Sequence, residues 1–196
     1  MMLVFDATAG KCAVAIFLDG QVKAARSDDM ARGHAERLFR LIDECLAEIG
    51  AAYGDLNAIA VCTGPGNFTG ARIGVAAARG LALSLSIPAI GVDRFDAAAL
   101  DQTGDICVRL EARGGAAHLA QYRDGVLQGA AETVQADDIA AFICDARVVV
   151  ADVADLASIA KVAQNRLDAG ETDRPAPRYL KPANAALPST PPPAII

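Results

Sequence analysis

The side chains that could carry out chemistry are few, and the first two lie near the start of the chain. Asp6 and Thr8 follow the apolar run MLVF. In an α/β fold, groups placed just after a buried strand face a cleft, where Asp6 could hold a metal ion through water and Thr8 could contact a phosphate. The alternative is a local turn, residues 6–8, in which Thr8 hydrogen-bonds to its neighbours. The residues therefore allow either a vestigial nucleotide cleft or a structural turn.

Histidine, serine and cysteine give no catalytic or metal-binding pattern. The two histidines, His34 and His118, form no HxxH or HxxxH pair, and no serine lies in a GxSxG motif. The cysteines stand in apolar stretches without a CxxC pair, which is typical of buried free thiols in a reducing cytosol. They are Cys12, Cys45, Cys62, Cys107 and Cys144. We therefore predict no metal site and no catalytic residue in this chain.

A glycine-rich loop at residues 61–80, VCTGPGNFTGARIGVAAARG, joins an apolar strand to a helix. A P-loop would end in Gly-Lys-Ser/Thr, whereas this loop ends in Phe68-Thr69-Gly70. A dinucleotide-binding unit fits in outline, because Gly64, Gly66 and Gly70 follow a strand and Asp93 ends the next one. The three-strand opening that precedes this unit and the lack of a hydride-transfer base disfavour it.

The expected helices at 33–49 and 69–86 carry more apolar surface than one core face needs. The apolar residues of 33–49 span about 160° of its circumference, whereas a core-facing stripe needs only about 100°. Small or apolar residues occupy nearly the whole circumference of helix 69–86. Each glycine inside it costs about 1 kcal/mol of helix stability relative to alanine, and close packing must offset this cost. This excess of apolar surface predicts that a protein partner covers part of the two helices. The alternative is that ordinary packing in the core of the chain covers all of it.

Composition and charge narrow the class of protein. The chain has 196 residues, of which 53% are hydrophobic, and its net charge is -6. Such a chain is globular, and its acidity makes it a poor binder of nucleic-acid phosphates by itself. It has no apolar run of membrane-spanning length and no signal-peptide pattern, so we expect a cytoplasmic protein without membrane contact.

The order of elements repeats, which predicts two related α/β lobes with a cleft between them. Each half opens with two strands, an Asp-Gly turn and a third strand, and then alternates helices and strands. We predict an N-terminal lobe at 1–102, a smaller C-terminal lobe at 103–182 and a flexible proline-rich tail at 183–196.

Four blocks of the sequence resemble the TsaB (YeaZ-type) family of bacterial threonylcarbamoyladenosine biosynthesis proteins. They are VFDAT, GHAERLFRLIDECLAEIG, LNAIAVCTGPGNFTGARIGVAAARGLALSLSIPAIGV and RYLKP. The resemblance is strong over about residues 2–100 and thinner beyond. It implies an α/β, actin-like ATPase (ribonuclease H-like) fold, in agreement with the two lobes that each open with a three-stranded antiparallel unit.

The resemblance also implies a function: a non-catalytic scaffold and activator in forming N6-threonylcarbamoyladenosine beside the anticodon of tRNAs reading A-starting codons. The related partner TsaD, which carries an HxxxH metal motif and binds ATP, would transfer the group, and the ATPase TsaE would join. This chain would have no cofactor of its own and would meet tRNA only through the complex. Periodicity and the family's interface together predict these contact residues for TsaD, or for a homodimer: His34, Leu38, Leu41, Ile42, Cys45, Gly70, Ile73, Gly74 and Ala77.

The sequence departs from the family pattern at one place that bears on function. Asp6-Ala7-Thr8 stands where the family usually has Asp-Thr-Ser, which weakens a nucleotide role. The alternative function is a free-standing ATP-dependent kinase or carbamoyltransferase of the same fold. It requires nucleotide turnover by the lone chain that Asp6→Ala abolishes. A peptidase would need a nucleophile–base pair, which the sequence does not display.

Overall fold

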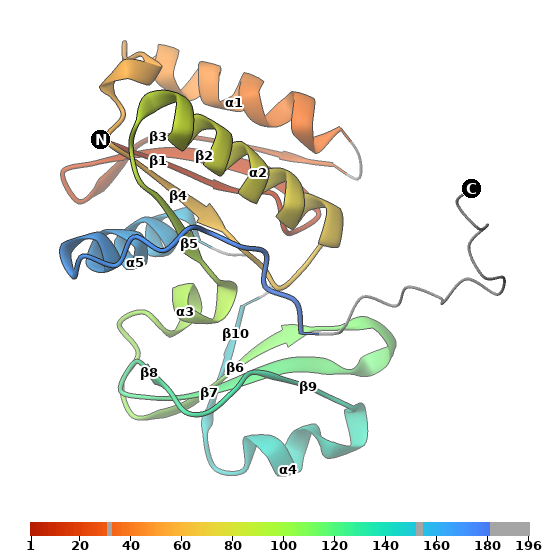
Figure 1. Ribbon diagram of the computed structural model, residues 1–196. Coiled ribbons are helices and arrows are strands. Elements are labelled where there is room, and N and C mark those ends of the chain that lie inside the picture. The colour runs from red at the N-terminus through yellow and green to blue at the C-terminus, as the bar shows by residue number, and fades with distance from the viewer. Residues whose placement is uncertain (31–32, 152–154, 181–196) are drawn as a thin grey trace, which may run out of the picture.

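The computed structural model, which describes residues 1–30, 33–151 and 155–180, has two lobes, each built on a five-stranded sheet (Figure 1). The first sheet has the strand order β3-β2-β1-β4-β5. Its strands are β1 (Met2–Asp6), β2 (Lys11–Leu18), β3 (Gln21–Asp29), β4 (Ala58–Cys62) and β5 (Ala89–Val92). The first three strands are antiparallel and the last two join in parallel, so β1 lies at the centre.

Local chemistry accounts for this sheet. Asp19 and Gly20 both take positive φ angles, 52° and 76°, at the turn between β2 and β3, as expected for an Asp-Gly hairpin. Strands β1 and β4 are buried throughout, because helices cover both faces of the sheet. The predicted antiparallel three-strand opening is confirmed.

Three helices cover the two faces of the first sheet. Helices α1 (His34–Glu48) and α2 (Phe68–Leu85) lie on one face, over a core that includes Phe5, Val14 and Ile59. Helix α5 (Leu156–Asp168) lies on the other face, where Ile159 and Ala163 contact Val4 and its neighbours. Figure 1 shows the sheet between these two helical layers.

The second lobe repeats the opening on a smaller scale. Its path is β10-β6-β7-β8, with β9 paired to β7. The elements are β6 (Asp105–Glu111), β7 (Ala117–Arg123), β8 (Val126–Leu127), β9 (Glu132–Val134), α4 (Ile139–Ile143) and β10 (Arg147–Val150). The sequence missed the three-residue β9. The short helix α3 (Arg94–Ala99) joins the lobes, and 3₁₀ turns occur at Tyr53–Asp55, Arg113–Gly115 and Ala136–Asp138.

Helix α5 crosses back to the first lobe. The expected boundary at residue 102 assigns it to the second lobe, yet its buried residues contact the first sheet. The physical reason is that this sheet has a second apolar face, which needs a cover, whereas the sequence pattern records only chain order. The lobe limits as a whole stay a prediction, and the expected tail at 183–196 lies outside the described residues.

Candidate partner interface

Asp6 and Thr8 form a closed turn. Thr8 donates two hydrogen bonds to Asp6 Oδ1, from its backbone N–H and from its hydroxyl, each at 2.6 Å. Both residues are buried, and the Thr8 hydroxyl also lies 3.4 Å from Cys62 Sγ. Thr8 thus hydrogen-bonds locally, as the structural turn requires, and the vestigial nucleotide cleft stays a prediction.

Two glycines of the 61–80 loop bring backbone directly onto this turn. A Cβ on Gly66 would lie 2.2 Å from the Thr8 carbonyl oxygen, and one on Gly70 would lie 1.7 Å from the Ala7 carbonyl oxygen. The Asn67 N–H donates to the Thr8 carbonyl at 2.6 Å. The glycines thus allow close packing of the loop backbone against residues 7 and 8.

Three buried cysteines of the first lobe, Cys12, Cys45 and Cys62, have raised thiol pKa values. Burial is the main cause that raises the pKa of the Cys62 thiol well above its ordinary value, and the nearby Asp6 adds to it. Burial likewise raises the pKa of Cys12 and of Cys45 to about 11. Because a thiolate is the nucleophilic form, these thiols are structural.

The contact residues predicted on α1 are buried inside the first lobe. Leu38, Leu41, Ile42 and Cys45 are fully enclosed in the core beneath α1, and His34 is 5% exposed. A docked protein cannot reach these side chains, so their assignment is corrected. Strands β2 and β3 and the neighbouring helix α2 all contact α1, so together they cover a wider arc of it than a single core face would.

The predicted residues on α2 divide between the two sides of that helix. Gly70 and Gly74 are buried, and Gly74 faces Val61 Cγ2 on its own sheet. Their assignment is corrected in the same way. Ile73 and Ala77 are half-buried and remain available.

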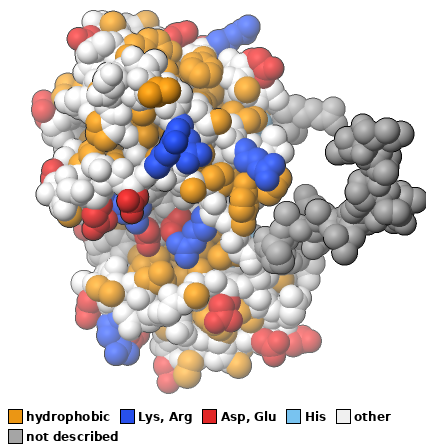
Figure 2. Space-filling model, in the orientation of Figure 1, with side chains coloured by type: hydrophobic (Ala, Val, Ile, Leu, Met, Phe, Trp, Pro, Cys, Tyr) orange, Lys and Arg blue, Asp and Glu red, His pale blue; other side chains and the backbone are white. Residues whose placement is uncertain are grey.

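The solvent side of the two helices forms what we call the helical surface, made mainly of small and apolar residues. Leu83 is 80% exposed and Phe39 is 43% exposed. Its members are Phe39, Ile73, Ala76, Ala77, Gly80 and Leu83. Figure 2 shows hydrophobic and basic side chains together over this part of the upper lobe.

An aromatic and basic cluster, the Arg72 cluster, adjoins the start of α2. The guanidinium carbon of Arg72 lies 3.8 Å from the Phe68 ring centroid, and Arg72 Nε donates to the Tyr179 hydroxyl at 2.9 Å. The Phe68 and Tyr179 ring centroids are 5.0 Å apart. Sequence reasoning missed this cluster, because 107 residues separate Arg72 from Tyr179. The only part of this cluster that the sequence could indicate is the contact between Phe68 and Arg72, which are four residues apart on one helix.

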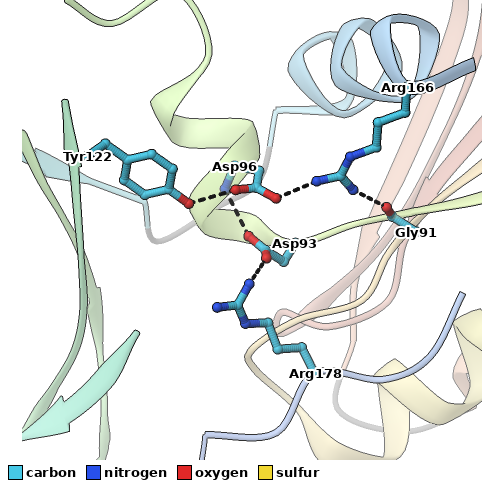
Figure 3. A network of polar contacts seen from close by, with 6 residues as sticks. All are labelled: Gly91, Asp93, Asp96, Tyr122, Arg166 and Arg178. Atoms are coloured by element: carbon cyan, nitrogen blue, oxygen red, sulfur yellow. Dashed lines mark hydrogen bonds and ion pairs between the residues drawn. The ribbon is translucent and has the colours of Figure 1, made fainter. Parts of the chain in front are cut away.

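A polar network joins the lobes to each other and to the C-terminal segment (Figure 3). Asp96 accepts from the Tyr122 hydroxyl of the second lobe at 2.7 Å and forms an ion pair with Arg166 of α5 at 2.5 Å. Asp93 caps α3 through the Asp96 N–H at 2.8 Å and forms an ion pair with Arg178. Figure 3 shows both carboxylates between the two arginines, so α3 holds the lobes and the C-terminal segment in one arrangement.

Burial dominates the ionisation of this network. It raises the pKa of Asp93 above its ordinary value, with a further contribution from Asp96, against the opposing effect of Arg178. It also raises the pKa of the Tyr122 phenol well above 10, again with Asp96 adding to the shift. Tyr122 therefore stays a hydrogen-bond donor, which suits a structural role.

Other kinds of site receive no support within residues 1–30, 33–151 and 155–180. This part of the chain contains no group of three or more His, Cys, Asp or Glu side chains placed to hold a metal ion. No helix in it combines the length and apolar character needed to cross a bilayer.

Comparison with known sequences gives a family match and several relatives. A family model described as "TsaD: tRNA N6-adenosine threonylcarbamoyltransferase" matches residues 27–186. Escherichia coli (strain K12) tRNA threonylcarbamoyladenosine biosynthesis protein TsaB is 33% identical over 127 residues, which are 62% of this chain and 54% of that protein. The chain thus spans about half the length of this relative.

Solved structures agree on the fold. A Pseudomonas aeruginosa crystal structure, of "an uncharacterized protein with similarity to peptidase YEAZ", has a TM-score of 0.76 at 22% identity and covers 92% of this chain and 99% of that chain. A polyphosphate/ATP-glucomannokinase from Arthrobacter sp. strain KM has a TM-score of 0.54 at 13% identity, over 86% of this chain and 98% of its own. The predicted α/β actin-like ATPase fold is therefore confirmed. Since the family model covers most of the chain, the chain belongs to the family that this model describes, tRNA N6-adenosine threonylcarbamoyltransferase (TsaD), as one of its TsaB (YeaZ-type) members.

Proposed function

We propose that this chain is a non-catalytic subunit that pairs with a TsaD-type catalytic subunit in forming N6-threonylcarbamoyladenosine on tRNA. TsaE would join the pair, tRNA would be met only through the assembly, and ATP and metal would be held by the partners. The chain would act in the cytoplasm, and homodimers would use the same surface. Kinship to the E. coli TsaB protein supports the pathway.

The observation that carries the pairing is the helical surface. It combines exposed apolar residues such as Leu83 with small residues such as Ala76 and Gly80, which let another helix approach closely. By contrast, the candidate reactive groups are enclosed: Asp6 and Thr8 bond to each other and Cys62 is a buried thiol. An exposed apolar helical surface, together with reactive groups that are buried, favours a scaffold role over an enzymatic one.

The test is co-purification of this chain with the TsaD-type subunit from the same genome, followed by tRNA modification assays with TsaE present. We expect a stable heterodimer, and modification that requires both chains. Ala76→Trp places a bulky side chain on the helical surface and should abolish pairing without lowering the melting temperature. Ala141→Trp, on another exposed helical alanine in the second lobe, is the matched control and should pair normally. Normal pairing by Ala76→Trp would contradict the proposed surface.

The alternative, an ATP-dependent kinase or carbamoyltransferase acting alone, is addressed by the same preparation. ATP hydrolysis by the purified single chain that is lost in Asp6→Ala, with the fold retained, would establish the alternative. We expect no turnover that depends on Asp6, because this carboxylate is fully buried and bonded to Thr8.

A further inference from the structure

The guanidinium of Arg72 is held in place but only partly used. Its Nε donates to the Tyr179 hydroxyl and its plane lies near the Phe68 ring. Its two terminal nitrogens have no hydrogen-bond or ion-pair partner among the described residues, and the side chain is exposed. These nitrogens form the edge of the guanidinium that binds a carboxylate through two parallel hydrogen bonds.

The surroundings leave this positive charge uncompensated. Residues 56–92 contain no Asp or Glu, and their two charges are Arg72 and Arg79. The two arginines are seven residues apart on α2, which places them on one side of the helix about 10 Å from each other. Neither has an ion pair in the described part of the chain, whereas the chain as a whole has a net charge of -6. This side of α2 is therefore a local basic stripe on an acidic protein.

The position of Tyr179 is fixed by the segment that precedes it. The Arg178 N–H donates to the Thr63 carbonyl at 2.9 Å, and its side chain forms the ion pair with Asp93. Tyr179 is thereby held against the first turn of α2. A side chain already ordered before binding loses less conformational entropy on association, and Tyr and Arg are among the residue types enriched at interface hot spots.

We propose that the Arg72 cluster is the polar anchor of the partner interface, where Arg72 binds a carboxylate of the partner protein. The inference rests on the proposed pairing and deepens it: the partner must bring an acidic side chain to the start of α2, bordered by apolar residues that meet Ile73 and Ala76. Tyr179 is a positioning residue, because it orients the guanidinium without touching the partner's carboxylate. The net charge of -6 favours a carboxylate on a folded partner over the phosphates of RNA.

The experiment measures the affinity of the full chain for the purified TsaD-type subunit by isothermal titration calorimetry. Arg72→Ala should weaken binding about 10- to 100-fold, as for a central interface arginine. Arg72→Lys keeps the charge but loses the two-donor edge, so it should also weaken binding. Tyr179→Phe, which removes one hydroxyl, should have a smaller effect. The control is Arg147→Ala, since Arg147 is an exposed arginine of the second lobe with one hydrogen bond to Gln102; it should bind normally. Melting temperatures of all variants check the fold.

Two further readouts separate the possible anions. The wild-type affinity should fall as NaCl rises, and this dependence should be weaker in Arg72→Ala. Sedimentation of the lone chain and tRNA-binding anisotropy should be the same for wild type and Arg72→Ala. If the substitution alters only self-association or only tRNA binding, the carboxylate proposal is overturned. Unchanged pairing by Arg72→Ala also overturns it but leaves the proposed function intact, whereas a wild-type chain that fails to pair at all removes both.

Discussion

Single residues decide how closely the backbone segments of the first lobe approach one another. Gly70, in the first turn of α2, lies against the Ala7 carbonyl, where even a methyl group would overlap the backbone. Gly80, in the same helix, is exposed, and a Cβ added to it would meet no atom within 4 Å. Gly70 is therefore required for close backbone packing, whereas Gly80 is not, although both appear in the sequence as glycines inside the same helix.

Substitution of these glycines by alanine should change stability in opposite directions. Gly70→Ala forces the backbone of residue 7 or of α2 to move, so we expect a loss of at least about 2 kcal/mol in the free energy of unfolding. Gly80→Ala meets no obstacle and removes the helix cost of glycine, so we expect a gain of up to about 1 kcal/mol. Urea unfolding of the two variants and the wild type measures both. Equal effects would contradict the close approach at Gly70.

The sequence predicted which residues of this region matter better than it predicted what they contact. The residue types of Asp6 and Thr8 identified them as candidate site residues. Whether their polar atoms face a cleft or each other depends on the loop that covers them. Arg72 was visible as a helix-surface residue, but its hydrogen-bond partner Tyr179 comes from a distant segment. Such contacts are set by tertiary packing, which local patterns do not encode.

At the scale of elements, periodicity located the helices and strands but misjudged how much of each helix is covered. The wide apolar arc of α1 suggested a surplus for a partner, yet Leu38 and Ile42 are fully buried by the sheet beneath. The exposed small and apolar surface lies mainly on α2, whose solvent side carries Ala76, Gly80 and Leu83. The period of a helix identifies its apolar face, whereas the neighbouring strands and helix that pack against it determine how much of that face is enclosed.

Helix α5 should contribute to the stability of the first lobe, although it follows the second lobe in the chain. Ile159 is fully buried against the first sheet, whereas Val162 on the same helix is half-buried. Ile159→Ala should lower the free energy of unfolding by about 2–5 kcal/mol, because it leaves a cavity in a packed core. Val162→Ala should cost clearly less. Chemical denaturation with a near-ultraviolet probe compares them, and similar small losses would mean that α5 is not part of this core.

For the whole molecule, α3 and the C-terminal segment hold the two lobes in one arrangement. Besides the carboxylates of Asp93 and Asp96, the buried Arg94 donates to the carbonyl of Pro65 at 3.2 Å and to that of Ala151 at 2.6 Å. Arg94 therefore links the glycine loop to the end of β10. Because these groups are buried, removing one partner leaves another polar group without compensation, so the lobes resist separation.

The raised pKa of Asp93 predicts an unusual pH dependence of stability. The folded state binds this proton more tightly than the unfolded state, so the contribution is present in acid and is lost as pH rises through the folded pKa. Asp93→Asn keeps a helix-capping oxygen but has no proton to bind. We therefore expect the stability of the wild type relative to this variant to increase as pH falls from neutral toward 3.8, the ordinary value.

Urea unfolding of both proteins across that range measures the difference. Asp105→Asn is the control with the opposite sign, because the hydrogen bond from Arg123 lowers the pKa of Asp105. The stability of the wild type relative to Asp105→Asn should decrease as pH falls. A flat difference for Asp93 would contradict the assignment of burial as the dominant cause.

The distance along the chain between Arg72 and Tyr179 also has a consequence for biosynthesis. A ribosome that adds about 5–20 residues per second reaches Tyr179 about 5–20 s after Arg72. Until then the emerging polypeptide displays its arginine without the hydroxyl that orients it. Under the proposed pairing, chains that end before Tyr179 should therefore bind the partner more weakly than chains that include it.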